Sequence, residues 1–295
     1  MFRGSMTALT TPFKNNRFDE ATLEKQIAFQ IKNGTDGVVP VGTTGESPTL
    51  THEEHRRVFE VAVSVCRGTG VKVIAGTGSN ATEEALELTE FAKKIGCDGA
   101  LMVNPYYNKP TQEGLFRHFK YIADRVNIPI ILYNIPGRTG ITMTVATAAR
   151  LARECPTIVA MKEATGSLDQ ASETLVHTKL TVLSGDDSLT LPMLAVGASG
   201  VISVATNIVP AEIKEMVTAA ARNDFATARS IHLRLFELFK ALFIETNPIG
   251  VKTAMQLLGR DTGELRLPLC EASSTNRLAI RQTLINVGLL PDGQA

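Results

Sequence analysis

The sequence predicts an α/β fold: a closed (β/α)8 TIM barrel over residues 1–224, followed by a C-terminal α-helical extension over residues 225–295. Short apolar runs rich in β-branched residues alternate with longer amphipathic stretches. Eight such runs occur within the first 224 residues, and only helical patterns follow Asn223. Eight strand–helix units in a segment of this size are typical of a TIM barrel, which usually takes about 250 residues.

The expected strands are short and mostly apolar, as strands covered on both faces should be. In chain order they are SMTALTTPF (5–13), GVVPVG (37–42), KVIAGTG (72–78), GALMVNPYY (99–107), IPIILYNIP (128–136), IVAMKEAT (158–165), LTVLSGDD (180–187) and GVISVATN (200–207).

Amphipathic stretches such as 20–34, 51–68 and 81–96 are long enough for the crossover helices that parallel strands require. The reciprocal capping spacing that begins a helix occurs at Thr51 with Glu54 and at Ser167 with Gln170. Glycines stand where the first three helices should end, at positions 34, 68 and 96.

A doubly wound open sheet uses the same alternation, but eight uninterrupted units favour the barrel. The stretch GTGSNA from Gly76 imitates a dinucleotide-binding fingerprint. That fingerprint normally occupies the first strand–helix turn, with an acid about 20 residues on that closes a second strand. Here it falls in the third unit and Asp98 opens a strand, so we expect no dinucleotide cofactor.

Composition indicates a cytoplasmic protein with neither a nucleic-acid nor a membrane partner. Thirty basic residues balance thirty acidic ones, and no apolar stretch reaches the roughly 18 residues that span a bilayer. The N-terminus lacks the features of a secretory signal. Four cysteines without CxxC spacing indicate reduced thiols: Cys66, Cys97, Cys155 and Cys270.

In barrels of this kind the active site lies at the C-terminal ends of the strands. The side chains with useful chemistry at those ends are Thr43, Thr44, Tyr106, Tyr107, Tyr133, Lys162, Asp186 and Asp187.

Lys162 is the only one of thirteen lysines near the end of an expected strand after an unbroken apolar run. Burial would lower its pKa from about 10.4 and leave a neutral amine, which attacks carbonyls to form Schiff bases. The alternative is a buried ion pair with Glu163 or with an aspartate of the next strand. Glu163 should point to the opposite side of the sheet, which makes that pair less favourable.

Two further patterns fit such chemistry. Three of the four tyrosines stand at strand ends, where a phenol can relay protons, although aromatic residues also seal barrel ends. The GTTGE stretch offers two hydroxyls and glycine-flanked amides as a cradle for a carboxylate, or is merely a glycine loop suited to a turn.

No metal site is expected. His52 and His55 in HEEH are three residues apart, not four as in zincins, and no third ligand is obvious. Solvent-exposed histidines on one helix face are the simpler interpretation.

The motifs GTTGES, NPYYNKP, YNIPGRTG, MKEATG, SGDD and GVISV, in this order and spacing, resemble the dihydrodipicolinate synthase family. The resemblance runs from Gly4 to Leu290 and places the chain in the pyruvate-dependent class I aldolase superfamily. It implies condensation of pyruvate with L-aspartate 4-semialdehyde in lysine and diaminopimelate biosynthesis, without a cofactor.

The resemblance also implies roles for single residues. Lys162 matches the Schiff-base lysine, and Tyr133, Thr43 and Tyr107 match the proton relay, with Tyr107 reaching in from the neighbouring subunit. The substrate-binding residues would be Thr44 for the pyruvate carboxylate, Ile202 for the pyruvate site and Arg138 for the semialdehyde carboxylate.

Members of the family usually form homotetramers built from two tight dimers and are feedback-inhibited by lysine. The matching regulatory residues are Ser47, Pro48, His52, His55, Asn80, Glu84 and Tyr106, which changes the simpler interpretation of HEEH. Pro48 stands where the family makes a backbone contact.

Other functions stay open at this point. N-acetylneuraminate and 2-keto-3-deoxy sugar acid lyases share the lysine and tyrosine but usually carry an apolar residue in place of Arg138. A metal-dependent class II aldolase and a non-catalytic small-molecule sensor are further alternatives.

Overall fold

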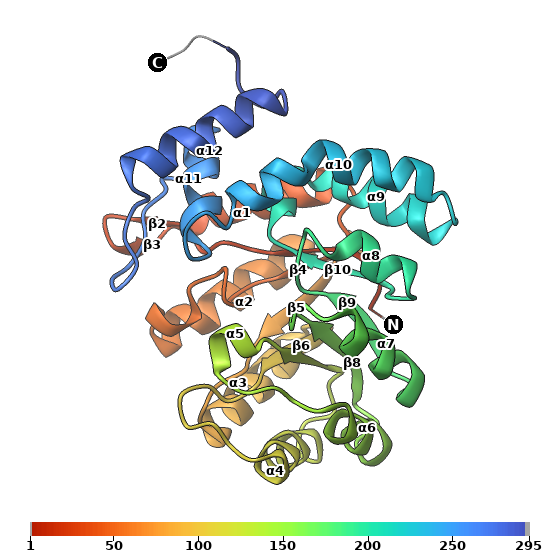
Figure 1. Cartoon of the computed structure of the whole chain (residues 1–295). Coiled ribbons are helices and arrows are strands. Elements are labelled where there is room, and N and C mark those ends of the chain that lie inside the picture. Colours follow the sequence, from red (N-terminus) through yellow and green to blue (C-terminus); the bar gives the residue numbers. More distant parts are fainter. Residues whose placement is uncertain (1, 293–295) are drawn as a thin grey trace.

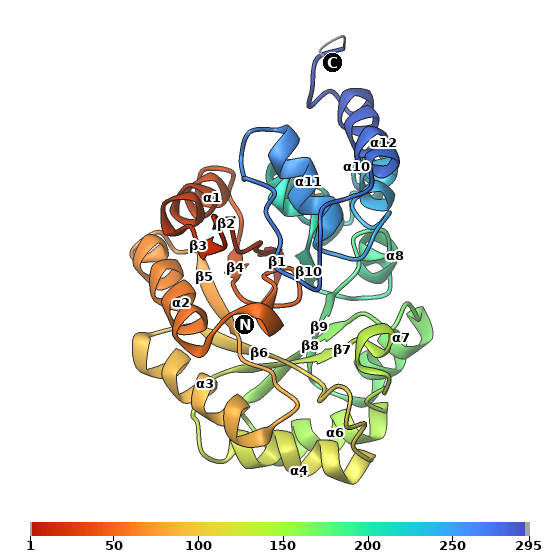
Figure 2. The same cartoon turned by 90° about the vertical axis from the view of Figure 1, so that its left-hand side faces the viewer.

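The computed structural model describes residues 2–292 and confirms the predicted barrel. Eight parallel strands close into a ring in the order β1-β10-β9-β8-β7-β6-β5-β4 (Figure 2). Their bounds are β1 Gly4–Ala8, β4 Gly37–Val39, β5 Lys72–Gly76, β6 Gly99–Val103, β7 Ile130–Asn134, β8 Ile158–Glu163, β9 Thr181–Ser184 and β10 Gly200–Ser203.

Helices cover the outside of the ring (Figures 1 and 2). They are α1 Glu20–Lys32, α2 His52–Cys66, α3 Thr82–Ile95, α4 Gln112–Ala123, α6 Val145–Glu154, α7 Leu168–His177, α8 Thr190–Ala195 and α9 Pro210–Ala221. Short helical turns follow three strands: η1 Ser47–Thr49, α5 Pro136–Thr139 and η2 Ala205–Asn207.

Side chains from the strands fill the centre of the ring. This buried cluster includes Met6, Ile74, Ile131, Leu183 and Ile202. Because alternate residues of a strand point to opposite faces, the other strand residues pack against the surrounding helices. The barrel is therefore closed at its centre, and any site must lie at one of its ends.

The first strand is shorter than the run 5–13 suggested. β1 ends at Ala8, and the chain then forms a small hairpin of β2 Phe13–Lys14 and β3 Arg17–Phe18, which was not predicted from the sequence. Proline has no backbone N–H to donate to a neighbouring strand, so Pro12 is unsuited to extending β1.

The two predicted helix starts have different outcomes. Thr51 and Glu54 form the full reciprocal capping box of α2. The Ser167 hydroxyl accepts from the Gln170 N–H, but the Gln170 side chain donates to the Met143 carbonyl instead of returning to the cap. The predicted return hydrogen bond from the Gln170 side chain to the backbone of Ser167 was therefore wrong, because the Gln170 amide donates to the carbonyl of another loop.

The fingerprint-like glycines serve the barrel itself. A Cβ on Gly76 would lie 2.3 Å from the Val41 oxygen, and one on Gly78 would lie 2.4 Å from the Val103 nitrogen. Both positions therefore need glycine because neighbouring backbone approaches them closely.

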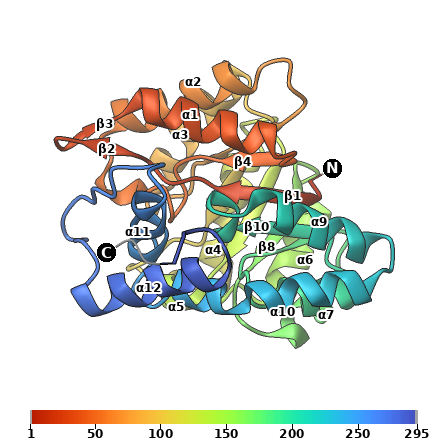
Figure 3. The ribbon, with the colours of Figure 1, turned by 90° about the horizontal axis from the view of Figure 1, so that it is seen from above.

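Beyond the ring come α10 Phe225–Ala241, α11 Ile249–Leu257 and α12 Ser274–Asn286, with α12 against α10 and α11 (Figure 3). A single buried cluster joins these helices to α9 and β10, including Val201, Ile213, Leu235, Val251 and Ile280. The boundary at residues 224/225 stays a prediction, and the apolar core runs across it. None of the helices in residues 2–292 has the length and apolar character of a membrane span.

Candidate active site

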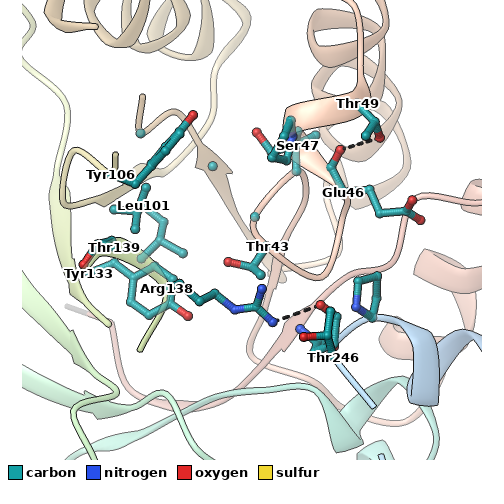
Figure 4. Close-up of a pocket in the computed structure, with 18 of the residues that line it drawn as sticks. Thr43, Glu46, Ser47, Thr49, Leu101, Tyr106, Tyr133, Arg138, Thr139 and Thr246 are labelled. Atoms are coloured by element: carbon teal, nitrogen blue, oxygen red, sulfur yellow. Dashed lines mark hydrogen bonds between the residues drawn. The ribbon is translucent and has the colours of Figure 1, made fainter. Parts of the chain in front are cut away.

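A cavity of about 310 Å³ opens at the C-terminal ends of the strands (Figure 4). It gathers residues from the loops after β4, β6 and β7 and from the segment before α11. The predicted residues that line it are Thr43, Ser47, Pro48, Tyr106, Tyr133 and Arg138. Members of the predicted catalytic and regulatory sets thus border one cavity.

Lys162 lies on β8 directly beside Tyr133 of β7 in the strand register. Its Nζ is 4.3 Å from the centre of the Tyr133 ring, and the side chain is buried. Burial lowers the pKa of Lys162 to about 8, an effect that the Asp187 carboxylate opposes and the Arg138 guanidinium reinforces. A substantial fraction of the amine is therefore neutral near pH 8.

The alternative of a locked ion pair is not what the structure contains. Lys162 is in none of the ion pairs formed by residues 2–292. Glu163 points elsewhere, and its carboxylate accepts the Thr165 N–H at 2.7 Å. The predicted separation of Lys162 from Glu163 is confirmed.

Asp187 is the buried acid that influences Lys162. One of its oxygens accepts the N–H groups of Val204 and Ala205 at 3.1 and 2.9 Å. Burial nevertheless raises the pKa of Asp187 to about 6. At neutral pH most of this carboxylate is charged, which favours the ammonium form of Lys162.

Tyr133 is a buried phenol at the floor of the cavity. Burial raises the pKa of Tyr133 to about 12, with Arg138 and the Thr43 hydroxyl acting in the opposite direction. Figure 4 shows the Thr43 side chain on the same side of the cavity as Tyr133 and Arg138. A phenol with such a pKa holds its proton and can donate it to an oxygen on a bound substrate.

Asn247, which no sequence pattern indicated, connects two predicted substrate-binding residues. Its side-chain Nδ2 donates to the Thr44 hydroxyl at 3.0 Å, and its carbonyl accepts from Arg138 Nη2 at 2.9 Å. Asn247 follows no strand and lies 203 residues from Thr44 in the chain. Its only local signal is an Asn-Pro dipeptide before a helix, which indicates a turn and not a site.

Four predicted catalytic or substrate-binding residues are not among those that line the cavity: Lys162, Thr44, Ile202 and Tyr107. Ile202 is fully buried in the barrel interior, in the same apolar cluster as Leu183 and Tyr133. Tyr107 has 92% of its surface exposed and a backbone φ of 70°. Tyr107 therefore faces outward from this chain and away from its own Lys162.

The predicted regulatory residues lie around the N-termini of α2 and α3. His52 Nε2 is 3.0 Å from Glu84 Oε1, and the Ser79 hydroxyl donates to the other Glu84 oxygen. Burial together with the Glu84 charge raises the pKa of Tyr106. The backbone carbonyl of Asn80 accepts a hydrogen bond from the Asn108 side-chain amide at 2.8 Å.

His55 corrects the first interpretation of HEEH. Unlike His52, it is buried, and its Nε2 lies 2.9 Å from the Gly76 carbonyl, so that nitrogen must carry the hydrogen. Burial lowers the pKa of His55 to about 4 and keeps the ring neutral. The interpretation of two solvent-exposed histidines is therefore wrong for His55, because α2 turns that position toward β5.

Comparison with known proteins gives a consistent result. Residues 1–287 match the Dihydrodipicolinate synthetase family. A relative from Methanocaldococcus jannaschii, named 4-hydroxy-tetrahydrodipicolinate synthase, is 54% identical over 290 residues, covering 98% of this chain and 100% of the relative.

Two solved structures superimpose closely. Dihydrodipicolinate synthase from Aquifex aeolicus has a TM-score of 0.96 at 55% identity, covering 98% of this chain and 99% of that one. The enzyme from Cyanidioschyzon merolae, solved with lysine bound, has a TM-score of 0.96 at 45% identity and the same coverage.

The charge of Asp187 should set the protonation of Lys162. We expect Asp187→Asn to lower the pKa of Lys162 below about 8, because the carboxylate that favours the ammonium is gone. The measurement is the pH dependence of Lys162 acetylation by acetic anhydride, read by peptide mass spectrometry. Asp186→Asn is the matched control and should leave the midpoint unchanged; an equal shift in both variants would contradict the assignment.

Proposed function

The chain belongs to the dihydrodipicolinate synthetase family, whose members are lyases of the aldolase type, and on that premise we propose that it condenses pyruvate with L-aspartate 4-semialdehyde. The observation that carries the proposal is the buried Lys162 amine beside Tyr133, with its pKa lowered to about 8. Such an amine is nucleophilic at the pH of a cell.

In the proposed reaction the Lys162 nitrogen attacks the keto carbon of pyruvate. The resulting carbinolamine loses its oxygen as water and leaves an iminium that links the lysine to the substrate. Loss of a methyl proton then gives an enamine, whose carbon attacks the semialdehyde carbonyl and forms the new carbon–carbon bond.

Tyr133 is the proposed proton donor to the departing oxygen and the acceptor of protons afterwards. Its buried phenol next to Lys162 and the nearby Thr43 hydroxyl support this role. Tyr107 of the partner subunit would complete the relay across a tight dimer. The exposure of Tyr107 in the single chain supports a contact between subunits in the proposed homotetramer.

The substrate carboxylates have separate proposed partners. The Thr44 hydroxyl accepts from Asn247, so its own proton stays available to donate to the pyruvate carboxylate. Arg138 is proposed to bind the semialdehyde carboxylate, since it lines the cavity and is held there through one of its nitrogens. Ile202 would contribute an apolar wall to the pyruvate site.

We further propose that lysine inhibits the enzyme by binding among the predicted regulatory residues: Ser47, Pro48, His52, His55, Asn80, Glu84 and Tyr106. The lysine-bound structure of the Cyanidioschyzon merolae relative supports this. Glu84 offers a carboxylate to an ammonium, and Tyr106 borders the cavity that also contains Tyr133 and Arg138.

Reductive trapping tests the central step. Borohydride added in the presence of pyruvate should attach one reduced pyruvyl group to the Lys162 peptide, and the trapping rate should rise with pH through about 8 as the amine loses its proton. Peptide mass spectrometry locates the adduct. Lys162→Arg should give none, and modification of a different lysine would refute the assignment.

Arg138→Ala separates the two substrates. We expect kcat/KM for the semialdehyde to fall about a hundredfold, since a charge-assisted contact is lost, while saturating pyruvate is still trapped on Lys162. Trapping is measured above the Lys162 pKa, because losing Arg138 should also raise that pKa. Equal loss of both activities would argue against a substrate-specific role.

Glu84→Gln tests the regulatory proposal. The variant should need about tenfold more lysine for half-maximal inhibition, since a neutral amide pairs poorly with an ammonium. The matched control is Glu87→Gln on the same helix, where the carboxylate faces Arg56. If the lysine concentration for half-maximal inhibition changed equally in both variants, or in neither, Glu84 would not be part of the lysine-binding pocket.

A further inference from the structure

The loop of residues 42–46 (GTTGE) has a shape that its own backbone only partly determines. The Gly45 N–H donates to the Gly42 carbonyl at 3.0 Å, and the Glu46 N–H donates to the Thr43 carbonyl at 3.2 Å. Glu46 closes the loop with a φ of 53°, in the left-handed region that residues with a Cβ rarely adopt. Something outside the loop must hold Glu46 there.

The Glu46 side chain is completely buried and points away from Tyr133 and Arg138 (Figure 4). One oxygen accepts from Lys252 Nζ at 2.6 Å, and the other accepts the Arg266 N–H at 3.1 Å. Both charged side chains of the Glu46–Lys252 pair have no exposed surface. The pair joins the loop after β4 to α11 and to the segment that follows it.

Lys252 has two further contacts that fix its position. Its ammonium donates to the Thr11 carbonyl at 2.9 Å and lies 4.4 Å from the centre of the Phe13 ring. The Thr11 hydroxyl in turn donates to the Gly45 carbonyl at 2.7 Å. The last two residues of the loop are therefore held by different partners. Thr11 binds the backbone of Gly45, and Lys252 binds the side chain of Glu46.

Stability alone is a poor explanation for this arrangement. Removing two charges from water is costly, and apolar residues of similar volume often serve a core equally well or better. A buried ion pair with defined hydrogen-bond partners can instead hold the backbone around it in one conformation. That conformation fixes the residues beside Thr43 and Thr44, which are the cradle proposed for the keto acid.

We propose that Glu46 and Lys252 are positioning residues, whose buried ion pair holds loop 42–46 in the shape that binds the carboxylate of the keto acid. This inference rests on the proposed function. Neither residue takes part in the bond-forming steps; the pair acts through the backbone of the loop and through α11, and Asn247, two residues before that helix, also holds Thr44.

The test is reductive trapping of pyruvate on Lys162 as a function of pyruvate concentration. In Lys252→Met and in Glu46→Gln, we expect about a tenfold higher pyruvate concentration for half-maximal trapping. At saturating pyruvate the trapping rate should stay within about twofold of the parent rate, because the amine is unchanged. The double variant, which leaves no unpaired buried charge, should fold and show the same raised half-saturation.

Lys214→Met is the matched control. Lys214 pairs with Asp36 at 2.6 Å just before β4, at the opposite end of the barrel. Its loss should lower Tm without changing half-saturation by pyruvate. If the variants of Glu46 and Lys252 fold and reach half-maximal trapping at the same pyruvate concentration as the parent, the pair is purely structural and the proposal is overturned. A parent chain that forms no adduct at all would instead refute the proposed function itself.

Discussion

The proposed chemistry depends on the removal of one amine, that of Lys162, from water. The barrel places Lys162 at the end of β8, where Tyr133 on the neighbouring strand and the filled interior below it exclude solvent. Burial opposes the charged form and lowers the pKa of Lys162 to about 8. A closed ring of parallel strands suits this purpose because its packed interior desolvates a side chain at the strand end, and the C-terminal end is where the active sites of such barrels lie.

Two neighbouring charges adjust that amine in opposite directions. The Asp187 carboxylate favours the ammonium, and the Arg138 guanidinium favours the neutral form. In the proposed reaction Arg138 has a second task, since it binds a carboxylate. Because the semialdehyde meets Lys162 only as the enamine, the Arg138 charge favours the neutral amine before pyruvate is captured and is free to bind the second carboxylate afterwards.

The C-terminal segment is part of the site and not only an appendage. Asn247 holds Thr44 and Arg138, while Lys252 and Arg266 hold Glu46. The apolar cluster shared by β10 and helices α9 to α12 fixes this segment against the barrel. Loop 42–46 and the cavity that it borders therefore depend on residues about 200 positions away in the chain.

The sequence alone determined the fold and much of the candidate site, because strand periodicity and the rule for barrel active sites are both local. Eight apolar runs identified the barrel, and Lys162 stood out as a lysine ending one of them. Only tertiary structure decided which helix residues are buried. His55 occupies the polar stretch HEEHRR and Lys252 is a single charge in the apolar stretch IGVKTAM, and helix packing turns one toward Gly76 and the other toward Glu46. Asn247 was equally invisible, since long-range contacts leave no periodic pattern in the residues that make them.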